Sequence, residues 1–221
     1  MRSSLKSRVE RIQERVKRLK MRKVVEAGDE PKEKTFRYII MNLPVERVSN
    51  EKLDEMREKT RNIAALFKTR EAVREDIPSL CDLYNTAFFQ CPDPYRPVTI
   101  DDMTQIYDHS HIILGSMYGM DSAFIVIKFE EQENEDGVIE KIAVVCGIAV
   151  HPRHRQKGLA TATGLAAWEF LEEKPLDMLQ CEVYEKNEPS LSFISWVGFR
   201  PVGELLIKAS SANAINPLER I

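Results

Sequence analysis

The feature that most constrains the fold is an unbroken apolar run of nine residues, 142–150, within the β-rich segment Ile139–Val150. A strand that is apolar on both faces must be covered on both faces, so it is expected at the centre of a sheet. Pro152 then ends the strand, because proline cannot donate a ladder hydrogen bond. The run therefore predicts a central strand with packed layers on either side.

Strand and helix patterns alternate around this run, from residue 66 to residue 207. The predicted order is one strand, two helices, three strands, and then helix, strand, helix and strand. This order indicates a mixed α/β (α+β) fold around one sheet. The tail, 208–221, is rich in Ser, Ala and Asn and is expected to be loosely ordered. Strands are predicted at 66–72, 112–118, 123–129, 139–150, 178–184 and 199–207, and helices at 75–89, 100–109, 159–172 and 190–197.

The first 65 residues are predicted to be a basic, helical N-terminal extension of the 66–207 domain. Residues 1–23 contain ten Lys or Arg and two Glu, a balance of +8, so the rest of the chain carries −11 of the net charge of −3. Within 3–24, apolar residues recur at helical spacing and form one stripe. The stripe consists of Leu5, Val9, Ile12, Val16 and Leu19.

After a polar break, an apolar run at 36–41 favours a short extended segment. Asn50 is then expected to be the N-cap of a second helix. The helical spacing predicts that this helix turns four residues inward. They are Leu53, Met56, Thr60 and Ile63.

The basic arm allows three kinds of partner. We favour packing of its apolar stripe on the chain's own domain or on a second subunit, which would give a homodimer. Contact of residues 2–23 with nucleic acid is the next alternative, and it would weaken steeply with salt. A membrane-surface helix is disfavoured, because no Trp or Phe precedes Phe36 to anchor it.

Neither export nor a membrane span is expected. The N-terminus has no apolar h-region, and no apolar run approaches the ~20 residues that a bilayer requires. The four cysteines show neither CxxC spacing nor a partnered His, which predicts reduced thiols and no metal site. We therefore expect a cytoplasmic protein.

A basic loop joins the central strand to a helix that is rich in Ala and Thr. The first turn of a helix has free N–H groups and the positive end of the helix dipole, so it attracts anions. Gly158 and Ala160 leave space for phosphate oxygens, and basic side chains add a positive field. The loop is neither a Walker loop nor a GxGxxG turn. It reads His151-Pro152-Arg153-His154-Arg155-Gln156-Lys157-Gly158-Leu159-Ala160-Thr161.

The segment Arg155-x-x-Gly158-x-Ala160 resembles the Q/R-x-x-G-x-G/A signature of the GNAT superfamily of N-acetyltransferases. It stands where that signature is expected, between the central strand and its helix. Two flanking segments extend the resemblance to about residues 66–207. They are Thr69-Arg70-Glu71-Ala72 with Asp76-Ile77-Pro78, and Asn187-x-x-Ser190 with Gly198-Phe199.

The resemblance implies a GNAT-like acyl-CoA N-acyltransferase fold, with acetyl-CoA (coenzyme A) as co-substrate and no metal. The end of Ile139–Val150 would splay from Met178–Tyr184 and admit pantetheine, while amides from Gln156 to Thr161 would hold the pyrophosphate. The alternative is a solvated basic loop without a ligand. The implied cofactor-binding residues are Ile148, Val150, Arg155, Gln156, Lys157, Gly158, Leu159, Ala160, Thr161, Asn187 and Ser190.

Direct acyl transfer requires a neutral amine, a stabilised oxyanion and a proton for the departing thiolate. We expect the backbone N–H at Ile148 to stabilise the oxyanion. Many family members carry a tyrosine acid seven residues after the Asn, and this chain has Ile194 there. We favour Tyr184 as the substitute acid, with Ser192 and Ser195 as alternatives. The candidate bases are Glu182, His111 and His151, whereas Cys146 is expected to be a buried, inert thiol.

Aromatic residues between the first two helices of the domain are candidates for holding the acceptor. Phe88, Phe89 and Tyr95 would form a rim for an amine-bearing small molecule or peptide. The alternative is that these rings pin the loop to the core.

The sequence thus predicts an N-acetyltransferase that moves an acetyl or short acyl group from acetyl-CoA to a primary amine in a ternary complex. A non-catalytic acyl-CoA sensor is one alternative, because the usual tyrosine is absent. A regulatory protein tethered to nucleic acid by its basic arm is another.

Overall fold

The computed structural model describes residues 34–134 and 136–209. The predicted N-terminal helix of residues 3–24 lies outside these residues. Of the predicted tail, 208–221, residues 208 and 209 belong to the last strand and the rest lies outside them. The described residues all belong to one compact unit that begins at Glu33.

Seven strands form one sheet in the order β2-β3-β4-β5-β6-β1-β7. Among the strands of the described residues, β5 and β6 run parallel, and all the other neighbours are antiparallel. The central position of β5 agrees with its predicted burial on both faces. The strands are β1 (Lys34–Pro44), β2 (Phe67–Glu71), β3 (His111–Met117), β4 (Met120–Glu133), β5 (Ile139–Val150), β6 (Met178–Tyr184) and β7 (Arg200–Ala209).

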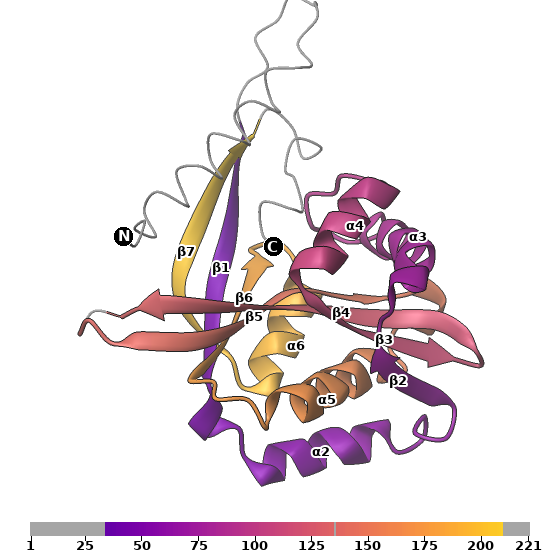
Figure 1. Cartoon of the computed structure of the whole chain (residues 1–221), viewed down its shortest axis with the longest axis horizontal. Helices are drawn as coiled ribbons and strands as arrows, with labels where there is room; N and C mark the ends of the chain where they lie inside the picture. Colours follow the sequence, from indigo (N-terminus) through magenta and orange to yellow (C-terminus); the bar gives the residue numbers. More distant parts are fainter. Residues whose placement is uncertain (1–33, 135, 210–221) are drawn as a thin grey trace, which may run out of the picture. The chain divides into compact units, whose positions relative to one another are not determined.

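Helices cover both faces of the sheet (Figure 1). α3 and α4 pack on one face of β3–β5 around Leu80, Ile106 and Phe124. α5 and α6 pack on the other face, and α2 forms an outer layer against α5 through Leu53, Met56 and Leu165. The helices are α2 (Asn50–Thr60), α3 (Ile77–Phe88), α4 (Ile100–His109), α5 (Leu159–Leu171) and α6 (Glu188–Val197), with short 3-10 turns at Val45–Arg47, Arg74–Asp76 and Pro152–His154.

From β2 to β7 the order of strands and helices is the predicted one, and the mixed α/β fold is confirmed. The bounds of α4, β5 and β6 coincide with the predicted bounds. Each of these elements has a sharp local boundary. Thr99, for example, starts α4 with a capping box to Asp102.

β1 is longer and more central than the predicted extended run at 36–41. It lies between β6 and β7, and pairs with both in antiparallel register. Phe36 and Tyr38 pack beside Tyr184, whereas Met41 and Leu43 join the core under α5 and α6. Residues 34–65, which the sequence grouped with the N-terminal extension, are therefore part of the folded unit.

The N-cap of α2 lies one residue earlier in the chain than predicted. Ser49, not Asn50, is the N-cap, and its hydroxyl accepts a hydrogen bond from the Lys52 N–H at 3.2 Å. Ser49 has the extended backbone that an N-cap requires, whereas Asn50 is already helical. The predicted inward residues of this segment, among them Leu53 and Met56, are buried as expected.

Candidate functional site

The sheet opens at the carboxyl end of β5. β5 and β6 pair only where residues 142–145 meet 178–181, although both strands continue further. Cys146 is an extra residue of β5 relative to β4, because Gly147 pairs with Val126 and Val145 pairs with Ile127. Such a bulge bends its strand, which accounts for the divergence from β6. We call the opening between residues 146–150 and 182–184 the wedge.

Main-chain groups of β5 line one side of the wedge. The His151 N–H donates to the Ser122 carbonyl at 2.8 Å, and the register pairs Val150 with Ala123 next to it. Bonded and non-bonded pairs alternate in an antiparallel ladder, so Ile148 and Val150 occupy positions that do not bond to β4. Their N–H and C=O groups therefore point into the wedge.

α5 starts beside the wedge with an uncapped turn. Gly158 is the N-cap with φ +85°, and no side chain caps the helix. The N–H of Ala162 makes the first intrahelical bond, to the Gly158 carbonyl, so the amides of 159–161 have no intrahelical acceptor. Gln156 is also left-handed, with φ 59°. Left-handed residues next to a helix start turn successive N–H groups into a concave anion site.

The sequence needs glycine at 158. Its positive φ is costly for any other residue, and a Cβ there would lie 3.4 Å from the Lys59 carbonyl oxygen.

A surface depression of about 650 Å³ adjoins the turn. Burial lowers the pKa of His154 in the same loop, so its imidazole is neutral at pH 7. The depression is lined by residues of the loop and of the end of α2, including Gln156, Lys157, Gly158, Thr161, Lys59 and Asn62.

The Arg155 side chain turns toward α3 and the loop after it. Its guanidinium donates to the Ala87 carbonyl at 2.7 Å and to the Gln90 carbonyl at 3.4 Å, and it lies 3.7 Å from the Cys91 sulfur. Its Nε also donates to the Val150 carbonyl at 3.4 Å. These bonds cap the C-terminus of α3, where a cation is favoured. Arg155 thus joins α3 to the end of β5, a role that the sequence did not predict.

Asn187 lies on the other side of the wedge, at the start of α6. It is buried, and its carbonyl oxygen accepts a hydrogen bond from the Ser190 N–H at 3.2 Å. Its amide donates to the Asp93 carboxylate. Asp93 stands between Pro92 and Pro94, which restrict the backbone to extended conformations. The segment 90–93 therefore bridges both sides of the wedge, held by Arg155 on one and Asn187 on the other.

The predicted acceptor residues lie at or next to this bridge. Phe88 stacks on Tyr84 with ring centroids 4.4 Å apart, and it packs over Gly147 of β5. Phe89 is 73% exposed and meets the edge of the Tyr95 ring at 6.0 Å. The Tyr95 hydroxyl donates to Asn85 at 3.1 Å. Phe88 and Tyr95 thus help to pack the loop, whereas Phe89 is open to solvent.

Strand alternation places the candidate acid and base on one face of β6. Leu179, Cys181 and Val183 point into the core under α5 and α6. Glu182 and Tyr184 therefore point to the opposite face, toward the side where α3 and α4 lie. Tyr184 is buried, and its ring packs 5.5 Å from that of Tyr38.

Ile194, at the position of the usual tyrosine, is buried and lines a cavity beside the wedge. A tyrosine there would have pointed at the wedge from α6. The alternatives Ser192 and Ser195 lie on the exposed side of α6 and are not directed inward.

The other candidates for proton transfer or nucleophilic attack have structural contacts. His111 packs between Phe129 and Phe170, near the end of α5 that is far from Gly158. His151 accepts a hydrogen bond from the Arg153 N–H at 3.2 Å and caps a 3-10 turn. Cys146, the extra residue of β5, packs partly buried against the core under α3 and α4. None of the three is placed as a base or a nucleophile.

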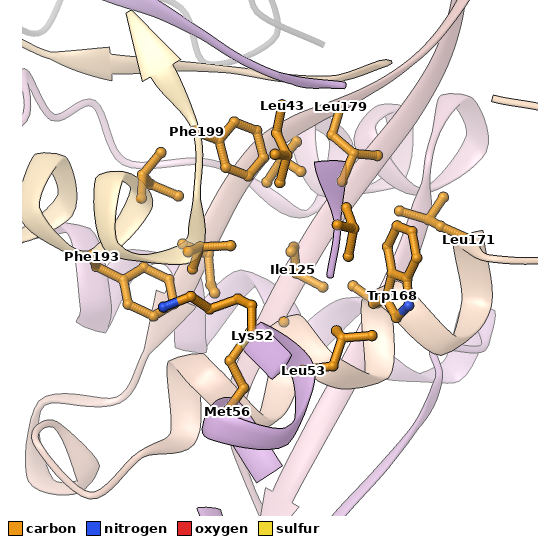
Figure 2. Close-up of a pocket in the computed structure, with 17 residues that line it drawn as sticks. Leu43, Lys52, Leu53, Met56, Ile125, Trp168, Leu171, Leu179, Phe193 and Phe199 are labelled. Atoms are coloured by element: carbon orange, nitrogen blue, oxygen red, sulfur yellow. The ribbon is translucent and has the colours of Figure 1, made fainter. Parts of the chain in front are cut away.

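An apolar cavity of about 80 Å³ lies on the α5/α6 side of the wedge (Figure 2). Its walls come from the sheet and from α2, α5 and α6, and Lys52 is its one charged lining residue. Sequence reasoning missed both this cavity and Asp93. The proline on each side of Asp93 was the local signal for a stiffly held carboxylate. The lining residues are Leu43, Val48, Lys52, Leu53, Met56, Ile125, Val145, Ile148, Gly164, Ala167, Trp168, Leu171, Leu179, Phe193, Ile194, Val197 and Phe199.

Among residues 34–134 and 136–209, no helix combines the length and the apolar character needed to cross a membrane. In the same part of the chain, His, Cys, Asp and Glu side chains form no group of three or more that could hold a metal ion.

The family described as "Acetyltransferase (GNAT) family" matches residues 77–199, more than half of the chain. No curated protein matches. The ribosomal-protein-S18-alanine N-acetyltransferase from Escherichia coli is a similar solved structure, with 18% identity and a TM-score of 0.50, covering 62% of this chain and 80% of that one.

Two further solved structures are similar. The aminoglycoside antibiotic 6'-N-acetyltransferase AAC(6')-Ih from Acinetobacter baumannii has 15% identity and a TM-score of 0.52, over 64% of this chain and 95% of that one. A functionally unknown conserved protein from Staphylococcus epidermidis ATCC 12228 has 9% identity and a TM-score of 0.56, over 84% of this chain and 69% of that one. At these identities the likeness concerns the fold alone.

Proposed function

This chain belongs to the GNAT family of acetyltransferases, and we propose that it transfers an acetyl or other short acyl group from a CoA thioester directly to a primary amine. The observation that carries the proposal is the uncapped first turn of α5 next to the wedge. Unbonded amides bind a diphosphate, and an open strand edge binds the amides of pantetheine. The uncapped turn and the open strand edge lie next to each other, as the linked diphosphate and pantetheine of acyl-CoA require.

In this proposal the main chain holds the thioester. The amides of 156–161 bind the diphosphate, and the groups of Ile148 and Val150 that face the wedge bind pantetheine. As the amine attacks, the thioester oxygen gains negative charge. The Ile148 N–H stabilises that oxyanion, which is the term that most often dominates acyl-transfer catalysis.

The amine enters from the α3/α4 face, where Glu182 points. An alkyl amine is protonated at pH 7, since its ordinary pKa is ~10.4, so it must lose a proton before attack. Glu182 takes that proton, directly or through water. The C–N bond then forms, the C–S bond breaks as Tyr184 protonates the thiolate, and the second proton of the nitrogen returns to Tyr184, directly or through water. Ile194 has no proton to donate, so α6 does not supply the acid.

Calorimetry with acetyl-CoA, followed by thiol release with a panel of amines, tests the proposal. We expect Gly158→Glu to weaken acetyl-CoA binding by at least about 100-fold, because it adds a negative charge and backbone strain at the diphosphate site. Gly137→Glu is the matched control. Gly137 has φ +76° and lies between β4 and β5, at the opposite end of β5 from the turn, so it carries similar strain away from the diphosphate site. Equal binding by both variants and the parent would contradict the proposal.

The acceptor panel should include cationic amines, because two similar structures are named as N-acetyltransferases of a ribosomal protein and of an aminoglycoside. The absence of a tyrosine at Ile194 favours one second candidate, a non-catalytic acyl-CoA sensor. The same experiment separates the two. Tight acetyl-CoA binding without thiol release on any amine would indicate the sensor.

A further inference from the structure

The apolar cavity beside the wedge extends beyond the site needed for CoA itself. β5 runs from Val150, near the start of α5, to Val145, at the vertex of the wedge, over roughly 17 Å at ~3.3 Å per residue. A pantetheine arm that leaves the diphosphate site follows this course, its thioester carbonyl meets the Ile148 N–H, and an acyl chain continues from there toward the vertex. The cavity is lined there by Val145 and Leu179, and by Ala167 and Leu171 in the second half of α5.

The cavity borders the wedge. Ile148, whose main chain faces the wedge, also contributes its side chain to the cavity, and Ile194 closes it from α6. Figure 2 shows Ile125 near the middle of the lining residues, with Trp168 and Phe193 on opposite sides. A chain attached at the vertex can therefore pass from the wedge into the cavity without crossing a polar layer.

The other face of the vertex leaves less room for such a chain. The Phe88 ring fills the space over Gly147, where an added Cβ would lie 3.9 Å from its Cζ atom. Tyr84 stacks on Phe88 from behind and restricts its movement. Apolar atoms beyond the thioester carbonyl thus find more room on the α5/α6 face than on the face from which the amine attacks.

The walls of the cavity are apolar and come partly from outside the segment that matches the family. Val48, Lys52, Leu53 and Met56 come from residues that precede the family match at 77–199. The Lys52 stem lines the cavity, while its ammonium group lies outward between Glu55 and the Trp196 ring. α2 therefore adds a further apolar wall to the space beside α5 and α6.

We infer that this cavity binds the acyl chain of the donor, and that the preferred donor carries more carbons than acetyl. The inference rests on the proposed transferase function and specifies its donor. A cavity of 150 Å³ is known to hold benzene, or about 25 Å³ per carbon. The volume of about 80 Å³ therefore accommodates about three carbons beyond acetyl. A short-chain acyl-CoA near butyryl or valeryl fits it.

A chain-length series of saturated acyl-CoA thioesters, from acetyl to octanoyl, tests the inference with the full-length protein. The kcat/KM for one amine should rise about fourfold per added methylene, the value of burying one CH₂, and fall beyond about three. Free CoA serves as the reference ligand in calorimetry, because it lacks the acyl chain.

Two variants fill the cavity. Ala167→Leu adds three carbons at a buried lining residue and should lower the valeryl-to-acetyl ratio of kcat/KM at least about tenfold. Gly164→Ala adds one carbon with an ordinary contact, 3.7 Å from Met56 Cε, so it folds even where the larger change does not. It should shorten the preferred chain by about one carbon. Ala65→Leu, at an exposed residue outside the cavity, is the volume control.

A steady fall of kcat/KM from acetyl onward overturns the inference but leaves the transferase function intact. So does an equal loss of affinity for free CoA and valeryl-CoA in Ala167→Leu, which would assign the cavity to pantetheine. If neither free CoA nor any thioester binds the parent protein, the proposed function fails, and this inference fails with it.

Discussion

The two sides of the wedge are built from different parts of the polypeptide. In the proposed function, the groups that hold the coenzyme on the β5–α5 side are main-chain amides and carbonyls near Ile148 and Gly158. On the β6 side, the groups proposed to move protons are the side chains of Glu182 and Tyr184. A main-chain site depends on backbone shape, which a short sequence motif can specify. A side-chain site depends on which residue occupies each position, so this half can change its chemistry while the coenzyme half is kept.

The replacement of the usual tyrosine by Ile194 illustrates this difference. The change removes one proton donor, yet the first turn of α5 and the divergence of β5 from β6 are intact. Variants on the β6 side should therefore affect turnover more than coenzyme affinity.

Glu182→Gln should have the largest effect. Without a carboxylate to accept the amine proton, kcat should fall about 100- to 10 000-fold, the usual contribution of general acid–base catalysis. The affinity for acetyl-CoA should stay within about twofold of the parent. Single-turnover kinetics and calorimetry measure the two quantities. Glu173→Gln, an exposed carboxylate beyond α5, is the control, and normal turnover in Glu182→Gln would remove this residue as the base.

Tyr184→Phe should lower kcat by about tenfold near pH 7, less than the usual range for an acid. A thiolate with an ordinary pKa of ~8.5 leaves with little help, and the loss should shrink as the pH rises past that value. The pH profile of kcat for Tyr184→Phe, with the exposed Tyr118→Phe as control, measures this. A loss that is constant with pH would mean that Tyr184 acts through packing against Tyr38.

Arg155→Gln tests a side chain of the β5–α5 side that bonds to both α3 and the loop after it. Its guanidinium bonds to the Ala87 and Gln90 carbonyls, so its loss should lower the free energy of unfolding by about 1 kcal/mol. The acceptor KM should rise, because the 90–93 segment loosens, while acetyl-CoA affinity changes by less than about threefold. Denaturant unfolding and calorimetry measure these effects. A large, salt-dependent loss of acetyl-CoA affinity would instead show that this side chain binds the diphosphate.

The smallest effect concerns a cluster away from the wedge, where α2 meets α6. Hydrogen bonds from Lys52 and then from Trp196 lower the pKa of Glu55 to about 2. Because this pKa lies below its ordinary value of 4.5, the carboxylate stabilises the fold fully above about pH 4.5 and loses this effect as the pH falls toward 2.

Thermal unfolding of the parent and Glu55→Gln between pH 6 and pH 2 measures that contribution. The difference in Tm between the two proteins should be largest near pH 6 and should vanish near pH 2. The control is Glu58→Gln on the same helix, whose carboxylate is exposed. A Tm difference that does not change with pH would show that the cluster acts without its charge.

Much of the coenzyme half was predictable because its determinants are local. The apolar run of β5, Pro152 after it, and Gly158 before a helix rich in small residues all act within a few residues of one another. They correctly predicted the central strand and the start of α5 at Leu159. The alternation of Leu179, Cys181 and Val183 with polar residues likewise predicted β6 with its observed bounds.

What the sequence did not determine depends on contacts between distant segments. β1 comes first along the described chain but sixth in the sheet, and its own residues do not predict that it pairs with β6 and β7. The face to which Glu182 points follows from which helices cover β6. The Arg155 side chain points to α3 because the helix end needs a cation there.

By itself, then, the sequence determined the order of the elements and the uncapped turn at Gly158, since backbone preferences and apolar spacing act locally. Only the tertiary structure decided the shape of the wedge, the α2 wall of the apolar cavity and the contact of Asp93 with Asn187. Each of these joins residues far apart in the chain. Their energies come from packing and hydrogen bonding that exist only once the sheet has formed.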